Sequence, residues 1–250
     1  MSPVNIPWLD ATSPFPEPHT ALGPNSGLAG LLAAGADLST QRLISAYRQG
    51  IFPWFSEGQP ILWWSTDPRM VLEVADFKLH RSLRKTLSQF SQSSDCEIRI
   101  NHAFEQVIQR CASIKRVGQP GTWIGPEMVI AYQALHEAGF AHSVETWVDN
   151  ALVGGLYCVA IGQSVFGESM FAQQSDASKI AFAGLIAFCR QHGITMIDCQ
   201  QNTRHLASLG AKEIPRGDFL QRIAHQQNLP SPQWRFESIY WQKLLPPRQT

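Results

Sequence analysis

Apolar residues recur every three or four positions in several stretches of the chain, and this spacing predicts amphipathic helices. Asp37 or Ser39 can cap the first helix, and Gly50 ends it. The other helices are predicted over residues 78–90, 103–113, 127–139 and 176–192.

Alternating or continuously apolar runs predict strands between these helices. The Asp149-Asn150 turn joins two of them into a β-hairpin, and Asp67-Pro68 breaks another run in two. The strand segments are residues 61–74, 97–101, 142–148, 151–162, 164–171 and 195–200. This order predicts a mixed α/β (α+β) protein with a central, largely antiparallel sheet.

A domain boundary is expected near residue 67. Residues 1–26 are rich in Pro and Ser and predict an extended arm on the protein surface. Residues 1–67 would then form this arm and a small N-terminal domain, and residues 68–250 the larger domain.

Composition limits the classes of partner. Of the 250 residues 44% are hydrophobic, which fits a globular protein with a sizeable core. The 20 basic and 20 acidic side chains give a formal net charge of zero. Because long nucleic-acid footprints usually require a basic excess, any RNA contact is expected to be local and sensitive to salt.

Targeting and metal signals are absent from the sequence. The first twenty residues lack a basic and an apolar region, and no apolar run approaches the roughly 20 residues that span a bilayer. The five cysteines form no CxxC pair and have no histidine at a metal-like spacing. We therefore expect a soluble cytoplasmic protein with reduced thiols, no membrane partner and no metal site.

The usual catalytic signatures are also missing, including GxSxG, the P-loop, GxGxxG and HExxH. A reaction on an already activated acyl donor would need none of them, because the donor carries its own leaving group. Positioning and electrostatics can then suffice. We therefore expect no cofactor.

Asp198 and Gln200 are the first catalytic candidates. Residues i and i+2 of a strand share a face, so the two side chains are expected side by side. A carboxylate and an amide could hold an attacking amine, direct its proton and polarise a carbonyl. The alternative is structural, with Asp198 capping a strand end and Gln200 a satisfied polar residue.

Glu168 is an acid within an apolar strand, so it must face solvent, a partner or a pocket. Its neighbours could line an apolar pocket, or could simply belong to the core: Phe166, Met170, Phe171 and Ile197.

Two further groups could contact a nucleotide. Trp54, Trp63, Trp64 and Trp123 lie in turn-rich segments, where two rings could stack on a base or could be structural. On the predicted helix 78–90, Arg81, Arg84 and Lys85 share the side opposite the leucines. They could face phosphates, or form an ordinary solvated surface.

Several segments together resemble the leucyl/phenylalanyl-tRNA–protein transferases over roughly residues 20–220. WWSTDPR, GESMF and DCQ are the most distinctive of these motifs. The matching segments include AYRQGIFPWF (46–55), ILWWSTDPR (61–69), GTWI (121–124), VFGESMF (165–171) and IDCQ (197–200).

The resemblance implies a fold, a reaction and a site. The fold is a small N-terminal domain followed by an acetyltransferase-like (GNAT-type) domain. The donor is Leu-, Phe- or less readily Met-tRNA, the acceptor is a protein with N-terminal Lys or Arg, and the product is marked for degradation through the N-degron pathway. The resemblance implies that Asp198 and Gln200 act in catalysis and that Trp54 and Trp123 stack on the adenosine. The residues implied to lie near the amino acid are Tyr47, Tyr132, Phe166, Glu168, Met170 and Ile197. Those implied to contact the tRNA are Arg81, Arg84 and Lys85.

Two other functions remain open on the residues alone. An acetyl-coenzyme A-dependent N-acetyltransferase usually holds pyrophosphate in a Gly-rich turn before a helix, whereas FAQQSDASK (171–179) has no glycine. A non-catalytic tRNA-binding module would bind tRNA whether or not it is charged.

Overall fold

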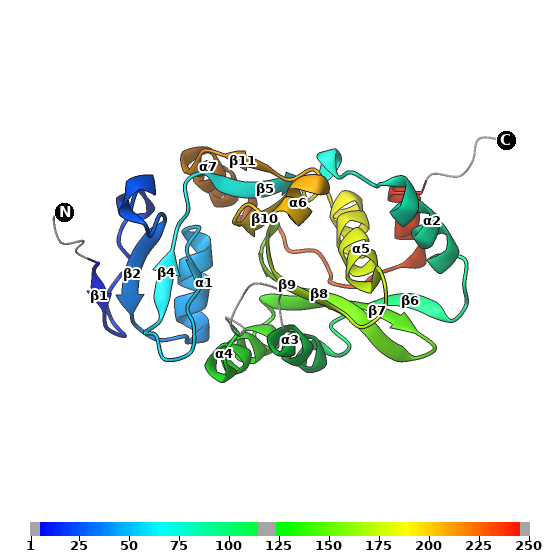
Figure 1. Ribbon diagram of the computed structural model, residues 1–250, viewed down its shortest axis with the longest axis horizontal. Coiled ribbons are helices and arrows are strands. Elements are labelled where there is room, and N and C mark those ends of the chain that lie inside the picture. The colour runs from blue at the N-terminus through cyan, green and yellow to red at the C-terminus, as the bar shows by residue number, and fades with distance from the viewer. Residues whose placement is uncertain (1–5, 115–123, 246–250) are drawn as a thin grey trace.

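The computed structural model describes residues 6–114 and 124–245. Figure 1 shows a smaller sheet near the N-terminus and a larger sheet that occupies the rest of the molecule. Helix α5 packs on one face of the larger sheet, and α3 and α4 pack on the other. The predicted mixed α/β fold is therefore confirmed. No helix in the described ranges has the length and apolarity to cross a membrane.

The smaller sheet has the order β1-β2-β4-β3. Its strands are β1 (Trp8–Leu9), β2 (Leu31–Gly35), β3 (Phe52–Pro53) and β4 (Leu62–Trp64). Because β1 pairs in parallel with β2, the N-terminal segment contributes a strand and is more than the extended arm that we expected.

The larger sheet has the order β11-β5-β10-β9-β8-β7-β6 within the described residues. Its neighbouring strands there pair antiparallel, except that β9 and β10 pair in parallel. The strands are β5 (Arg69–Glu73), β6 (Cys96–Ile100), β7 (Ala141–Val148), β8 (Ala151–Ile161), β9 (Ser164–Ala172), β10 (Met196–Gln200) and β11 (Lys212–Ile214).

The β7–β8 hairpin turns at Asp149 and Asn150, as the sequence predicted. Both residues have positive φ, of 50° and 58°, the conformation that a two-residue hairpin turn requires. This hairpin and the following strand β9 build the central part of the sheet.

The predicted helices are present, with small changes at their ends. They are α1 (Thr40–Arg48), α2 (Arg81–Phe90), α3 (Phe104–Ser113), α4 (Pro126–Glu137) and α5 (Ala177–His192), followed by α6 (Arg204–Ser208) and α7 (Arg216–Gln226). Ser39 caps α1, because its Oγ accepts a hydrogen bond from the Arg42 N–H. Helix α2 starts at Arg81 and not at residue 78, because the backbone of His80 is extended and the Lys78 N–H bonds to the Leu209 carbonyl.

The core surrounds the larger sheet on both faces. On the α3 and α4 side it continues into the smaller sheet, through residues such as Tyr47, Trp63 and Phe166. On the other side α5 and the C-terminal segment, including the 3₁₀ helix Ser238–Lys243, cover the sheet. Because one apolar cluster joins both sheets, the division into domains at residue 67 stays a prediction.

Candidate active site

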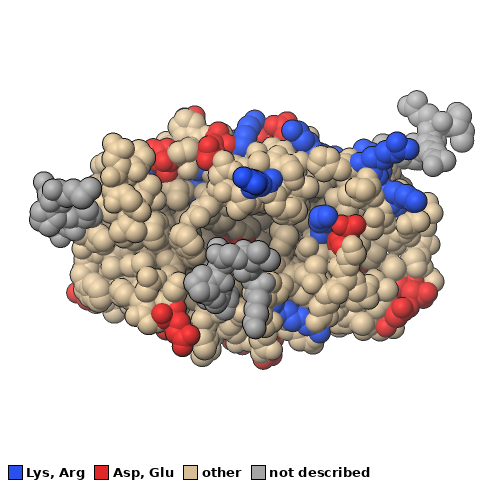
Figure 2. Space-filling model, viewed as in Figure 1, with Lys and Arg blue, Asp and Glu red and all other residues tan. Residues whose placement is uncertain are grey.

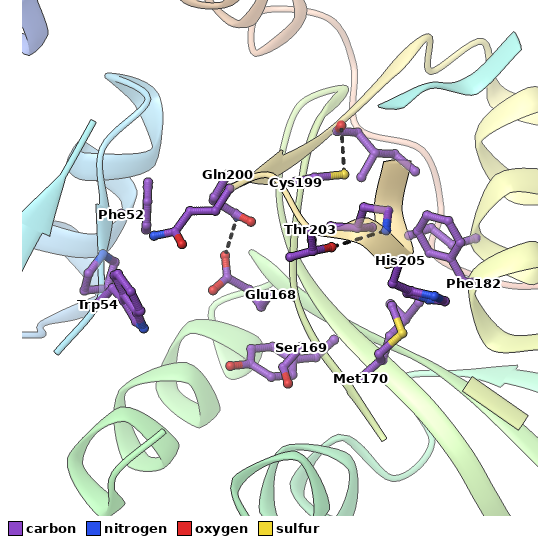
Figure 3. Close-up of a pocket in the computed structure, with 18 residues that line it drawn as sticks. Phe52, Trp54, Glu168, Ser169, Met170, Phe182, Cys199, Gln200, Thr203 and His205 are labelled. Atoms are coloured by element: carbon purple, nitrogen blue, oxygen red, sulfur yellow. Dashed lines mark hydrogen bonds between the residues drawn. The ribbon is translucent and has the colours of Figure 1, made fainter. Parts of the chain in front are cut away.

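A cavity of about 370 Å³ opens beside the parallel strands β9 and β10. The pairing of these strands ends where Asp198 lies opposite Phe166, and the residues that follow on each strand line the cavity. Strand β3 and the loop after it close another side. Figure 3 shows the lining side chains, which include Phe52, Trp54, Glu168, Met170, Phe182, Gln200, Thr203 and His205.

Glu168 is the centre of a hydrogen-bonded cluster at one end of the cavity. The Tyr47 hydroxyl donates to Glu168 Oε1 over 2.7 Å, and the Tyr132 hydroxyl donates to Oε2 over 3.3 Å. The Gln200 amide Nε2 donates to Oε1 over 3.4 Å. The three donors come from α1, α4 and β10, so three elements fix a carboxyl group carried by β9.

Burial changes the proton affinities in this cluster. It raises the pKa of Glu168 to about 7, and the nearby charge of Asp198 acts in the same direction. Burial and then the Glu168 charge raise the pKa of the Tyr47 and Tyr132 hydroxyls well above the usual value. The tyrosines therefore remain donors, whereas Glu168 can take or release a proton near neutral pH.

Asp198 lies beneath the cavity and is not among its lining residues. Its side chain is 1% exposed and forms a two-point ion pair with Arg69, with Nε–Oδ1 and Nη2–Oδ2 distances of 2.8 and 2.7 Å. The Arg69 guanidinium also donates to the Gly50 carbonyl and lies over the rings of Phe52 and Phe219. This buried pair joins the neighbouring strands β5 and β10 of the larger sheet, and Arg69 also contacts Phe52 of the smaller sheet.

The expectation that Asp198 and Gln200 lie side by side on one strand face is wrong. The register against β5 shifts between them, because Cys199 is an extra residue in β10, and Gln200 adopts a positive φ of 55°. The Gln200 side chain therefore reaches the cavity while that of Asp198 does not. Asp198 instead accepts the Gln200 backbone N–H through Oδ1 at 2.9 Å.

The predicted apolar pocket is partly assembled as expected. Met170 and Ile197 line the cavity, together with Leu156, Phe182, Leu185 and Leu206. Phe166 does not line it, because its ring packs on Tyr47 with centroids 5.1 Å apart. Phe171 is a buried core residue outside the lining, where Arg110 lies over its ring.

Of the candidate tryptophans, Trp54 lines the cavity. Trp64 supports it, since its indole N–H donates to the Trp54 carbonyl over 2.7 Å and the two rings lie 5.5 Å apart. Trp63 is fully buried and bonds to the Gly35 carbonyl. The prediction for Trp123 falls outside the described residues.

Sequence reasoning missed several residues of the site. Arg69 lies within the WWSTDPR motif but received no role, although a charged residue at the head of the apolar run Met70–Leu72 is a signal of a buried ion pair. Phe52, Phe182 and His205 reach the cavity from separate elements, and no local pattern identified them.

The basic residues of α2 lie away from the lining. Arg81, Arg84 and Lys85 are exposed, while Leu83, Leu87 and Phe90 on the other side are buried, so the amphipathic helix is confirmed. Figure 2 shows blue side chains at the end of the molecule that carries α2. Contact with phosphate stays a prediction.

The fold and the site together define a mixed α/β protein with a cavity that is acidic at one end and apolar at the other. Residues 36–67 match the model of the leucyl/phenylalanyl-tRNA protein transferase N-terminal domain, and residues 71–224 match the leucyl/phenylalanyl-tRNA protein transferase model. The chain therefore belongs to the leucyl/phenylalanyl-tRNA–protein transferase family, as its motifs predicted.

Individual relatives agree with this assignment. The leucyl/phenylalanyl-tRNA–protein transferase of Polaromonas sp. (strain JS666) is 61% identical over 97% of this chain and 95% of its own length. The protein of the same name from Albidiferax ferrireducens is 59% identical over 98% of this chain and 96% of its own length.

Among solved structures, FemX aligns with a TM-score of 0.44 and 11% identity over 74% of this chain and 71% of its own. A GCN5-related N-acetyltransferase from Kribbella flavida aligns with a TM-score of 0.33 and 11% identity, over 68% of this chain and 59% of its own. Similarities at this level carry no information on function.

Proposed function

We propose that this protein transfers Leu, Phe or less readily Met from aminoacyl-tRNA to the N-terminal Lys or Arg of acceptor proteins. The observation that carries the proposal is the two-ended cavity, with the Glu168 cluster at one end and an apolar wall at the other. The apolar wall can pack against an amino-acid side chain, and the Glu168 carboxyl group can hydrogen-bond to an amine. The substrate pair implies a reaction in the cytoplasm, which marks the acceptor for degradation through the N-degron pathway.

The donor would bind with its side chain against Met170 and Ile197 and its terminal adenosine against Trp54. Each methylene buried against the apolar wall contributes about 0.8 kcal/mol, which favours Leu and Phe over smaller side chains. Stacking of a base on a tryptophan contributes roughly 1–3 kcal/mol. Trp123 is proposed as the second ring of this stack.

The chemical step joins the acceptor's α-amine nitrogen to the ester carbonyl carbon. The bond from that carbon to the tRNA ribose oxygen breaks, the amine loses a proton, and the ribose hydroxyl gains one. Since burial brings the pKa of Glu168 to about 7, its carboxylate suits the transfer of this proton. Gln200 lies within hydrogen-bond distance of Glu168, and its amide oxygen is available to orient the amine.

In this scheme Asp198 acts through Gln200. The carboxylate receives the Gln200 backbone N–H and is itself fixed by Arg69, so it holds the residue in its positive-φ conformation. Tyr47 and Tyr132 hold the Glu168 carboxyl in place. Phe166 packs against the Tyr47 ring, and in this scheme it positions Tyr47 without contacting the substrate.

The test replaces Glu168 with Gln and, separately, Gln200 with Ala, and follows transfer of labelled Phe from Phe-tRNA to an Arg-ended peptide. We expect Glu168→Gln to lower the rate at pH 7 by about 10²- to 10⁴-fold, because the amide cannot accept the proton. An Ala-ended peptide and uncharged tRNA are the substrate controls. Near-normal rates for both folded variants would contradict the mechanism, and transfer of an acetyl group from acetyl-coenzyme A would contradict the function.

A further inference from the structure

Helix α6 lies between the mouth of the cavity and the start of α2. At one end of the helix, Thr203 and His205 line the cavity. At the other end, the Ser208 carbonyl accepts a hydrogen bond from His80 Nε2 over 2.8 Å, and the Leu209 carbonyl accepts the Lys78 N–H. These contacts join the cavity to the basic helix α2 through a continuous ridge of protein, which we name the α6 ridge (residues 203–209).

An exposed, positively charged side chain lies on this ridge. Arg204 is exposed, and its side chain forms no hydrogen bond or ion pair with the part of the chain that the structure describes. Burial lowers the pKa of the His205 imidazole, and the charge of Lys179 at the start of α5 acts in the same direction. Figure 2 shows separate blue side chains near the central hollow and others at the end that carries α2.

Two lysines near the ridge are already paired with acids. Asp176 pairs with Lys179 at 2.7 Å, and Asp76 pairs with Lys212 at 3.1 Å, so neither lysine is left free for a ligand. Arg204 is then, among the described residues, an unpaired cation on the helix that borders the cavity and contacts the start of α2. In a chain with a formal net charge of zero, this unpaired cation is a local attraction for an anionic ligand.

We propose that Arg204 binds the phosphates of the unpaired 3′ end of the tRNA donor. The proposal rests on the proposed function, since it requires the terminal nucleoside in the cavity. A nucleic-acid strand whose last nucleoside lies in the cavity and which leaves past Thr203 and His205 would bring its phosphates to Arg204, which these two lining residues flank in sequence. The paired acceptor stem then reaches Arg81 and Arg84 on α2. Successive phosphates bind positive grooves in a way that depends on charge and not on base sequence.

The experiment measures the affinity of uncharged tRNA against salt concentration, for intact tRNA and for tRNA that lacks its unpaired 3′ nucleotides. The variants are Arg204→Ala, Arg204→Lys and Arg84→Ala. Arg48→Ala is the matched control, because Arg48 is an exposed arginine of α1, outside the α6 ridge. Arg204 is exposed without partners among the described residues, so its replacement should leave the fold intact, which thermal unfolding checks.

We expect Arg204→Ala to weaken binding of intact tRNA about 3- to 10-fold at low salt, and to reduce the salt slope by about 0.7, the value for one single-strand phosphate. The truncated tRNA should bind the variant and the unchanged protein equally. Arg204→Lys should keep the slope, and Arg84→Ala should weaken both tRNAs.

Three results would overturn the proposal: unchanged binding of intact tRNA by Arg204→Ala, an equal loss with the truncated tRNA, or an equal loss in Arg48→Ala. An acceptor protein as the true partner would give the first result, together with weaker transfer to acidic acceptors. Failure of the proposed function is distinguishable, because it would abolish transfer of Leu and Phe by the unchanged protein while the tRNA-binding differences remained.

Discussion

The two ends of the cavity are built by different forces. At the acidic end, hydrogen bonds from three elements hold one carboxyl group, and a buried ion pair beneath it fixes the backbone of Gln200. At the apolar end, Met170, Ile197 and Phe182 define the wall by their volume alone. The acidic end is therefore suited to the chemical step, which is common to every substrate, whereas the apolar end can select among amino-acid side chains.

The largest expected effect on stability comes from removing Arg69, the buried cation beneath the acidic end. Arg69→Met leaves the Asp198 carboxylate buried without its partner, so we expect a loss of about 3–5 kcal/mol in the free energy of unfolding. Urea denaturation measures this loss. Lys212→Ala, which breaks the exposed pair with Asp76, is the control and should cost roughly 0–1 kcal/mol. Equal midpoints for Arg69→Met and the unchanged protein would show that the pair does not hold this end together.

The second prediction concerns pH. Burial raises the pKa of Glu168 to about 7 in the folded protein from its ordinary value of 4.5, so the folded state disfavours the carboxylate. The stability that the protonated carboxyl contributes is fully present below pH 4.5 and is lost as the pH rises to 7. The glutamine of Glu168→Gln cannot ionise. The free energy of unfolding of this variant, relative to that of the unchanged protein, should therefore rise by up to about 3 kcal/mol as the pH increases from 4.5 to 7, and then level off.

Denaturation at pH 4.5, 6 and 8 measures this difference. Glu97→Gln, which makes the same replacement at an acid outside the site whose side chain is 53% exposed, is the matched control. A stability difference that does not vary between pH 4.5 and 7 would mean that Glu168 ionises as an ordinary exposed acid does.

The smallest expected effect lies at the apolar end. Met170→Ala removes volume from the cavity wall, so larger side chains should gain over smaller ones. We expect the ratio of Phe to Leu transfer to rise by roughly threefold to tenfold, with the pH dependence unchanged. Competition between Phe-tRNA and Leu-tRNA measures the ratio. Phe171→Leu is the control, since Phe171 is buried outside the lining, and an equal change in ratio there would contradict the assignment.

Much of the fold followed from local pattern. The β7–β8 hairpin was predictable because Asp149 and Asn150 tolerate positive φ, and α2 because its leucines recur on one side. The start of α2 was not predictable, because a tertiary hydrogen bond from Lys78 to Leu209 keeps the preceding residues extended.

The site was predictable only in part. Its motifs identified Glu168, Gln200 and Trp54, which the structure brings to one cavity. They did not reveal that Phe166 supports Tyr47 from behind, because strand alternation does not specify which neighbour a side chain meets.

The mixed α/β fold could be predicted from the sequence because it depends on local periodicity. The family and the chemical types of the site residues could be predicted because they depend on motifs. Only the tertiary structure decided that Asp198 lies beneath the cavity with Arg69 while Gln200 enters it. An extra residue in β10 breaks the alternation of side chains, and Asp198 beside it is held by a buried ion pair with Arg69, which lies 129 positions away in sequence.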